Sequence, residues 1–455
     1  MSDIQRGGRR VAAWRAWSRR LVWALSLIVG VACLGGVHTS HAEVKALLSI
    51  SDFEREQNAA AIAAAQRSAS APASSISDAK IKLDAYQSAK DARGTTSLLT
   101  PRIVNGVLTG GYPAVGALLK STDGQFDVYC TGTLIGPVTM LTAAHCLSKD
   151  KMAKNYLVFL QNAGIFETER VAIPASFRFP DWDVGIVHLK RQVEAIAPMP
   201  VSAHPDPRPG SEAQIVGFGR TGNQNFDAGI KRTGNVILKA CQCIDANSCP
   251  KDGNQLCWSF DQGLAAPSRS NTCNKDSGGP LLFERIRGQV PDVVGVTSGG
   301  TDTDCTVNDQ SYDASIFKYR KWIALEAGLD LGKRATTFAL LGTEGSEVLI
   351  QMGTLTPSNR IDDYKLTVNP GVARIVITVN AENASTIQGL KIAASMASPQ
   401  TLLGLTCSNV NAPHFRACVI DQPAVGLVNL TVGGSTAGTV KYQITTTSLS
   451  KTIVK

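Results

Sequence analysis

The chain has 455 residues, of which 44% are hydrophobic and 18% charged, a globular composition in a chain too long for one ordinary core. Its formal net charge of +8 is concentrated near the start: residues 1–42 carry a net +5 and residues 43–102 a net +1, which leaves +2 for the rest. The charge therefore gives no electrostatic case for nucleic acid, and no nucleic-acid partner is expected.

The first 42 residues have the layout of an export signal. An arginine-rich stretch, 1–20, precedes an uncharged apolar run, 21–37, and Ser40-His41-Ala42 then places small residues at the positions that precede a cut. This order predicts a signal peptide, 1–42, that is cleaved after Ala42. The alternative is a membrane anchor, for which the apolar run is only marginally long enough. We therefore expect a secreted protein, extracellular or periplasmic, without a stable membrane anchor.

Residues 43–102 are rich in alanine, serine and charged side chains. They contain few large apolar residues, so they predict no hydrophobic core of their own. We interpret this stretch as a propeptide.

From residue 103 to about 330, short apolar runs alternate with glycine, proline and asparagine, which is typical of an all-β domain of barrels or sandwiches. One helix is predicted over 315–329, where Ile316, Tyr319, Trp322, Ile323 and Leu325 recur near helical spacing. The expected strands are 116–119, 133–135, 157–160, 184–189, 214–218, 236–238 and 293–297.

The chain changes character after Gly332. We assign 331–356 to a linker and 357–455 to a smaller β-sandwich domain, because threonine, valine and isoleucine alternate in several runs there. The expected strands are 364–368, 374–379, 428–432 and 440–445.

The chain has 11 cysteines, one of which, Cys33, lies in the predicted leader. The other ten are an even number, as expected for disulfides in an oxidising compartment. Cys241, Cys243, Cys249 and Cys257 could be misread as a metal cluster, but the export signal favours disulfides and no metal site is expected. These four allow three pairings, and the sequence does not choose among them.

Three segments carry candidate catalytic side chains in the order His145, Asp183, Ser277: 141–146 (Leu-Thr-Ala-Ala-His-Cys), 181–189, which begins Asp-Trp-Asp, and 271–280, which contains Asp-Ser-Gly-Gly-Pro. A serine hydroxyl is a weak nucleophile at neutral pH and needs a base, and the base needs a carboxylate to orient it. Each motif alone is more often structural, but the three together are specific.

In their settings these motifs resemble those of the trypsin/chymotrypsin-like serine proteases. The resemblance implies two six-stranded antiparallel β-barrels with a closing C-terminal helix. It implies that His145 is the general base, that Asp183 rather than Asp181 orients it, and that Ser277 is the nucleophile. The oxyanion hole would be formed by the backbone N–H groups of Ser277 and Lys275. The family usually has glycine at the position of Lys275, and loss of one donor lowers such rates by about 10²–10³-fold.

The sequence Arg102-Ile103-Val104-Asn105-Gly106 resembles the activation site of the same family. There, a cut before the isoleucine frees an α-amino group that pairs with the aspartate preceding the catalytic serine, here Asp276. The resemblance therefore predicts a zymogen that is cut between Arg102 and Ile103.

The family resemblance also places a specificity pocket. Asn271 is expected at its base and Ser298, Gly299 and Gly300 along one wall, with Asp309 or Asp313 as a further side chain pointing in. A neutral amide at the base argues against cleavage after arginine or lysine. Arg102 then implies a separate trypsin-like activating protease.

The resemblance also implies two disulfides: Cys130–Cys146 beside the histidine and Cys273–Cys305 at the specificity pocket. Cys407 and Cys418 then remain to pair with each other in the last region. That region resembles the pre-peptidase C-terminal domains of many secreted bacterial proteases.

The sequence as a whole predicts a monomeric secreted serine endopeptidase that hydrolyses protein or peptide substrates through an acyl-enzyme, without a cofactor. The alternative, kept open by Lys275, is a catalytically weak or inactive homologue that acts as an extracellular binding module.

Overall fold

The computed structural model describes residues 103–451, with gaps at 195, 243–252, 261–268, 303, 306–307, 334, 336–337, 341–347 and 383–386. The predicted signal peptide, the predicted propeptide and Arg102 lie outside the described residues, as do Cys33, Cys243 and Cys249. All described residues belong to one structural unit of the chain.

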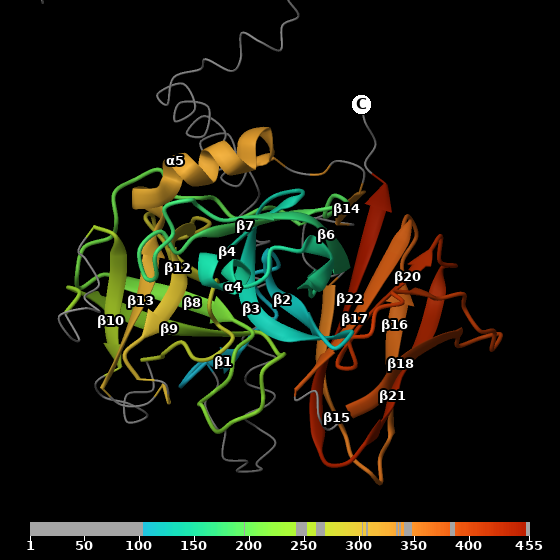
Figure 1. Cartoon of the computed structure of the whole chain (residues 1–455). Coiled ribbons are helices and arrows are strands. Elements are labelled where there is room, and N and C mark those ends of the chain that lie inside the picture. The colour runs from blue at the N-terminus through green and yellow to red at the C-terminus, as the bar shows by residue number, and fades with distance from the viewer. Residues whose placement is uncertain are drawn as a thin grey trace, which may run out of the picture. The chain divides into compact units, whose positions relative to one another are not determined.

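Six antiparallel strands close into a first barrel in the order β2-β3-β4-β7-β6-β5, drawn in cyan to green in Figure 1. Its core consists of inward-facing side chains of the apolar runs, such as Leu118, Leu134 and Ile186, which are all fully buried. The strands are β2 (Val115–Thr122), β3 (Gln125–Gly136), β4 (Thr139–Thr142), β5 (Tyr156–Leu160), β6 (Gly164–Ala172) and β7 (Gly185–Leu189).

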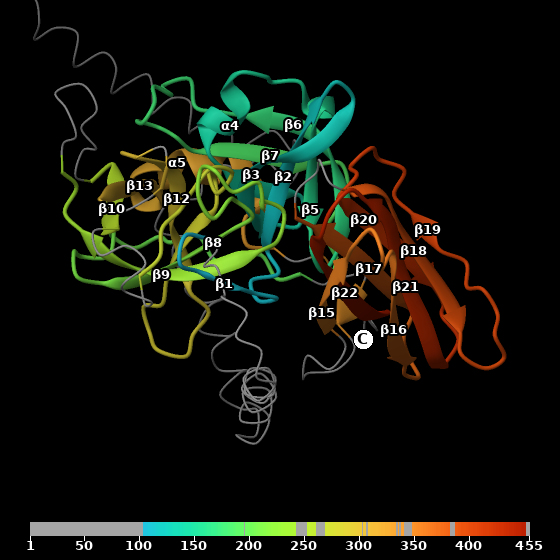
Figure 2. The same cartoon turned by 90° about the horizontal axis from the view of Figure 1, so that it is seen from below.

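A second barrel follows in the order β9-β10-β13-β12-β11-β8 and is closed by pairing of β8 with β9, which lie side by side in Figure 2. A short strand, β1 (Val107–Leu108), extends this sheet beside β9. The barrel strands are β8 (Glu212–Gly217), β9 (Arg232–Lys239), β10 (Gln255–Phe260), β11 (Pro280–Phe283), β12 (Asp292–Gly300) and β13 (Asp309–Ser315).

Helix α5 (Ile316–Ala327) follows directly on β13 and ends in a 3-10 turn, η4 (Gly328–Asp330). The Ser315 hydroxyl caps it by accepting the Lys318 N–H. Ile316, Tyr319, Ile323 and Ala327 form its buried face. Leu325 is 82% exposed, so it lies outside this face although it fits the helical spacing.

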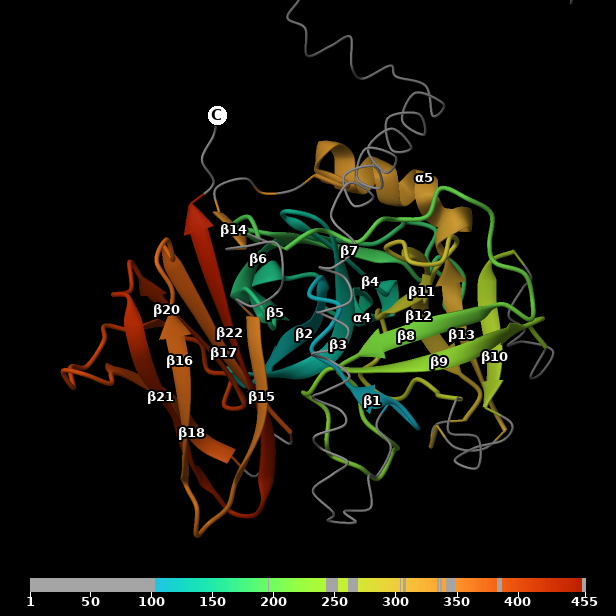
Figure 3. The same ribbon diagram turned by 180° about the vertical axis from the view of Figure 1, so that it is seen from behind.

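The C-terminal strands form two further antiparallel sheets, coloured orange to red in Figure 3. One has the order β14-β22-β17-β20-β19, with β15 also paired to β22, and the other has the order β16-β21-β18. The bounds are β14 (Phe338–Leu340), β15 (Val348–Leu355), β16 (Ile361–Val368), β17 (Arg374–Ala381), β18 (Ile387–Met396), β19 (Thr406–Cys407), β20 (Phe415–Asp421), β21 (Gly426–Thr436) and β22 (Val440–Lys451). A shared core of Leu355, Ile377, Leu430 and Tyr442, among others, joins the two sheets.

The expected fold class is confirmed: an all-β chain with two six-stranded antiparallel barrels, a closing helix and additional sheets after it. The described residues contain no helix that has both the length and the apolar character needed to span a membrane. Short helices α4 (Ala144–Ser148) and η2 (Ala153–Asn155) interrupt the first barrel, and α4 carries His145.

Candidate active site

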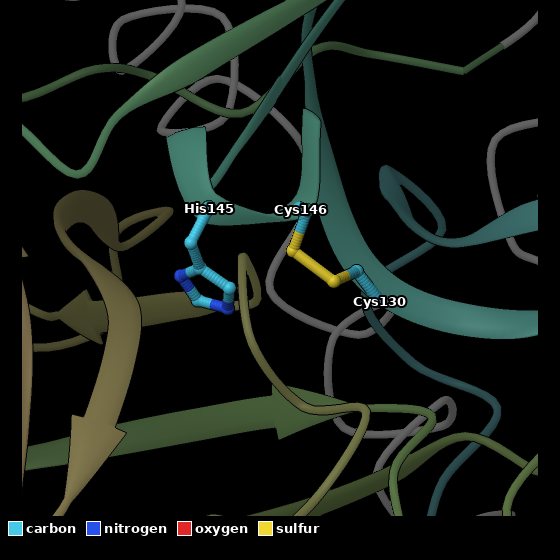
Figure 4. Close-up of side chains that lie close together, drawn as sticks. All are labelled: Cys130, His145 and Cys146. Carbon is cyan, nitrogen blue, oxygen red and sulfur yellow. A yellow bond between two sulfur atoms is a disulfide. The ribbon is translucent and has the colours of Figure 1, made fainter. Parts of the chain in front are cut away.

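His145 lies on α4, directly after β4, and its side chain is 28% exposed. The neighbouring Cys146 forms a disulfide with Cys130 of β3, which ties the helix to the barrel beside the imidazole ring (Figure 4). The ligand atoms of Cys130, His145 and Cys146 lie within 4.8 Å of one another. Because the two sulfurs are bonded to each other, they are not thiolates, and this grouping does not offer thiolate ligands to a metal.

Asp183 lies two residues before the start of β7 and is fully buried. Its Oδ2 lies 2.7 Å from His145 Nδ1, and its Oδ1 accepts the His145 backbone N–H at 2.8 Å. The hydroxyl of Ser298 donates to the same Oδ2 at 2.6 Å. The carboxylate thus fixes both the ring and the backbone of His145, an arrangement that stabilises the tautomer with a proton on Nδ1.

Asp181, the other candidate in this motif, lies in a different environment. Its Oδ1 accepts a hydrogen bond from the Asn254 side chain at 3.0 Å, and its carbonyl oxygen accepts the Arg178 N–H. The hydrogen bonds to His145 therefore come from Asp183.

Ser277 lies in the segment that leads into β11, and its carbonyl oxygen accepts the Thr131 N–H at 2.9 Å. Gly278 has a φ of +85°, and a Cβ there would lie 2.1 Å from Thr142 Oγ1 and 2.3 Å from the Thr131 carbonyl oxygen. This close approach, which only glycine allows, places the serine segment against the chain that carries His145. Within the described residues Ser277 Oγ makes no hydrogen bond to His145, and in such sites this bond often tightens only with substrate.

The backbone before Ser277 forms a tight turn in which Asp276 N–H donates to the Cys273 carbonyl oxygen. Lys275 has a φ of +78°, in the left-handed region that glycine favours. The Asn274 carbonyl oxygen accepts the Arg220 N–H, so the Lys275 N–H of the same trans peptide points the opposite way. In the described part of the chain, the N–H groups of Lys275 and Ser277 have no internal acceptor.

Asp276 is buried, and its two oxygens accept the N–H groups of Gly219 and Cys273. Burial raises its pKa to about 7, against the lowering effect of these two hydrogen bonds and of Arg232. Ile103 is also fully buried, and Val104 next to it pairs with Asn271. A Cβ on Gly217 of β8 would contact Asp276, and a Cβ on Gly234 of β9 would lie 3.4 Å from Ile103. Because β8 pairs with β9, Asp276 and Ile103 both pack against this pair of strands.

Asn271 is fully buried, and each polar atom of its side chain has a partner. Its oxygen accepts from Trp258 Nε1 and the Ser311 hydroxyl, and its nitrogen donates to Asp309 Oδ2 at 2.6 Å. The other oxygen of Asp309 accepts the N–H groups of Thr301 and Asp302. A carboxylate therefore contacts the amide that was expected at the pocket base, so the expectation of a neutral base rested on Asn271 without this partner.

Ser298, Gly299 and Gly300 lie on β12 next to these groups. A Cβ on Gly299 would lie 2.7 Å from the Tyr312 hydroxyl, and one on Gly300 would lie 2.8 Å from both oxygens of Asp309. Asp313 is opposite Thr297 on β13, and burial raises its pKa well above the usual range. Of the two aspartates considered from the sequence, Asp309 is therefore the one that contacts Asn271.

Four disulfides join described cysteines: Cys130–Cys146, Cys241–Cys257, Cys273–Cys305 and Cys407–Cys418. Cys130–Cys146 and Cys273–Cys305 are the pairs that the sequence resemblance implied, and Cys407–Cys418 is the pair that then remained in the last region. Within the four-cysteine group, Cys241 pairs with Cys257, one of the possibilities that the sequence left open. Sequence patterns did not predict two of these contacts: the hydrogen bond from the Ser298 hydroxyl to Asp183, and the contact of Asp309 with Asn271. Each contact joins chain segments that are far apart in sequence.

Comparison with known proteins agrees with this geometry. Residues 108–323 match the family model Trypsin. The chain is 29% identical to Factor V activator from Macrovipera lebetinus over 228 residues, which are 47% of this chain and 82% of the relative. Tonin from Rattus norvegicus is 26% identical over 43% of this chain and 80% of its own length. Snake venom serine protease 2B from Craspedocephalus gramineus is 30% identical over 34% of this chain and 62% of its own length.

The matched region begins within β1 and ends within α5, so it contains both barrels and the three segments that carry His145, Asp183 and Ser277. Two closed barrels, the buried Asp–His pair and the family match thus agree, and the chain carries a trypsin-like serine protease domain.

Proposed function

We propose that this protein is a secreted serine endopeptidase in which Ser277 is the nucleophile, His145 the general base and acid, and Asp183 the residue that orients His145. The observation that carries the proposal is the buried Asp183 carboxylate, which holds His145 by its ring and its backbone N–H at 2.7 and 2.8 Å. A carboxylate in this position keeps the proton on Nδ1 and leaves Nε2 free to accept one from the serine.

The mechanism follows from these positions. His145 Nε2 removes the proton of Ser277 as Oγ attacks the scissile carbonyl, and then gives it to the leaving amine, which leaves an acyl-enzyme. Water repeats the sequence and releases the acid. The free N–H groups of Lys275 and Ser277 would bind the oxyanion, and such donors are worth about 10²–10³ in rate.

Lys275 does not by itself support the alternative of an inactive binding module. That alternative assumed that a side chain at this position prevents the required backbone conformation. Lys275 has a φ of +78°, and the carbonyl oxygen of the preceding peptide is turned toward Arg220. This orientation supports a functional oxyanion hole.

We also propose synthesis as a zymogen that is activated by a cut between Arg102 and Ile103. The free ammonium of Ile103 would pair with the Asp276 carboxylate, whose pKa is raised by burial to about 7 although the charge of Arg232 lowers it. A buried carboxylate gains most from such a partner. A trypsin-like protease is the proposed activator, and export by the signal peptide would deliver a monomer to an oxidising compartment that suits the four disulfides.

The test is hydrolysis of a denatured protein substrate by the chain cut before Ile103. We expect proteolysis with burst kinetics on an ester substrate, and loss of both in the Ser277→Ala and His145→Ala variants. Correctly cut, folded wild-type protein that hydrolyses neither substrate would refute the proposal and favour the binding module.

A further inference from the structure

A chain of polar contacts joins the last domain to the turn that precedes Ser277. Lys275 Nζ lies 3.4 Å from Asp127 Oδ2, and Asp127 Oδ1 lies 2.9 Å from His414 Nε2. Asp127 belongs to β3 of the first barrel, whereas His414 immediately precedes β20 of the C-terminal sheets. One carboxylate thus connects a buried histidine of the last domain with the lysine at the proposed oxyanion hole.

Where this contact forms, the last domain packs against the first barrel. His414 is 1% exposed, and the adjacent Phe415 packs on Phe159 of β5 with ring centroids 4.7 Å apart. These residues belong to one hydrophobic cluster that combines first-barrel side chains with Ala412, Phe415 and Ala417. The Asn411 carbonyl oxygen also accepts the Phe126 N–H at 2.8 Å, one residue before Asp127. A shared core fixes the position of His414 relative to β3.

Asp127 is a charged acceptor for both partners. Burial would raise its pKa, but the His414 hydrogen bond and the charges of Lys275 and His414 outweigh this and lower it to about 2. It is therefore a carboxylate throughout the neutral range. Its 3.4 Å contact orients the Lys275 side chain, and the Lys275 carbonyl oxygen accepts the Thr131 hydroxyl at 3.0 Å.

Lys275 needs such support because of its backbone. A residue with a Cβ costs about 1 kcal/mol or more in the left-handed region, so a φ of +78° persists only where surrounding contacts impose it. The alternative is rotation of the peptide that carries the Lys275 N–H. Contacts that hold the side chain and the carbonyl oxygen of Lys275 oppose this rotation.

We propose that Asp127 and His414 are positioning residues through which the C-terminal domain holds Lys275, and with it the oxyanion peptide, in the reactive conformation. The proposal rests on the endopeptidase function stated above. The C-terminal domain is then an intramolecular support for the oxyanion hole, acting through a side chain where the related proteases usually have glycine.

A double-mutant cycle on the full chain, cut before Ile103, tests this. Asp127→Asn and His414→Ala are each expected to lower kcat about 10-fold with little change in KM, because the oxyanion contact forms in the transition state. His414→Gln, which retains an N–H donor at a similar reach, is expected to recover much of the loss. Glycine adopts a φ of +78° without strain, so Asp127→Asn should change kcat less than about 2-fold in a Lys275→Gly background.

Controls separate positioning from folding and from the proposed function. Asp421→Asn removes a carboxylate from the exposed Arg374–Asp421 pair of the same domain and should retain wild-type kcat. Circular dichroism and active-site titration restrict the comparison to folded, competent protein. Wild-type kcat in folded Asp127→Asn and His414→Ala, or an equal loss of kcat in the Lys275→Gly background, would overturn the inference. Inactive wild type would instead overturn the endopeptidase function.

Discussion

At the scale of single residues, the assignment of Asp183 rather than Asp181 has a direct test. Asp183→Asn preserves the shape of the side chain but favours the wrong histidine tautomer, and the expected loss in kcat is about 10⁴-fold. Asp181 contacts Asn254, so the matched Asp181→Asn variant should stay close to wild type. Hydrolysis of one peptide substrate by both variants at neutral pH measures the difference. Equal losses would remove Asp183 from its proposed role.

Asp309 leads to a prediction about substrate preference. Its carboxylate accepts a hydrogen bond from the Asn271 amide at 2.6 Å, so a carboxylate contacts the residue proposed for the pocket base. We expect preference for arginine or lysine before the scissile bond, and Asp309→Asn should lower kcat/KM for these substrates by about 10²-fold. Asp313→Asn is the control, because burial already favours the neutral form of Asp313.

Matched peptides with arginine or leucine before the scissile bond provide the measurement. A wild-type preference for leucine would restore the expectation of a neutral pocket. A preference for arginine would make the mature protein itself able to act as the proposed trypsin-like activator of its precursor, and would remove the argument for a separate activator that was drawn from a neutral pocket base.

At the scale of elements, Gly278 is the point where the serine turn meets the histidine segment. A Cβ at Gly278 would lie 2.1 Å from Thr142 Oγ1, whereas Gly288, with a nearly equal φ of +86°, has nothing within 4 Å of that position. Gly278→Ala and Gly288→Ala should therefore incur a similar backbone strain of about 1 kcal/mol. Only Gly278→Ala should also displace the turn and abolish most activity.

Unfolding by urea and hydrolysis rates distinguish the two effects of these alanines. We expect Gly288→Ala to retain wild-type kcat and Gly278→Ala to lose at least about 10²-fold, comparable to loss of one oxyanion donor. Equal kcat in both variants would contradict the close approach of the two segments.

Local sequence patterns predicted the elements well, for a physical reason. The apolar run 157–160 lies within β5, and all of 184–189 except its first residue lies within β7, because the valine, isoleucine and phenylalanine side chains of these runs favour a buried, pleated strand. Leu325 shows the limit: it fits a helical period but faces solvent, because tertiary packing selects which side of α5 is buried.

At the scale of the whole molecule, long-range contacts could not be predicted from the sequence. The three catalytic candidates could be found because each lies in a distinctive local motif. His414 and Asp127 are 287 positions apart and lie in no such motif, so only folding brings them together. The Asp309–Asn271 contact likewise depends on the register of β13 beside β12 and β10.

The proposed activation predicts a change in pH-dependent stability. The Asp276 pKa is raised from 3.8 to about 7 in the continuous chain, so the folded state binds more protons than the unfolded state between these values. The uncut chain should therefore lose stability as pH rises through this window, by at most about 4 kcal/mol. The Ile103 ammonium of the cut chain favours the carboxylate and should remove most of this loss.

Urea unfolding of the Ser277→Ala chain at pH 5 and pH 8, uncut and cut, measures this effect. The Asp276→Asn substitution, added to the same uncut chain, removes the titrating group and supplies the reference. Parallel stability profiles for the uncut chain with and without this substitution would refute a penalty from the Asp276 carboxyl.

The most direct test of the central claim is covalent labelling by a fluorophosphonate serine probe. The account predicts that the probe labels the chain after the cut before Ile103, that peptide mapping locates the adduct on Ser277, and that the cut Ser277→Ala variant stays unlabelled. Absence of labelling from folded, correctly cut protein, or an adduct on another serine, would contradict it.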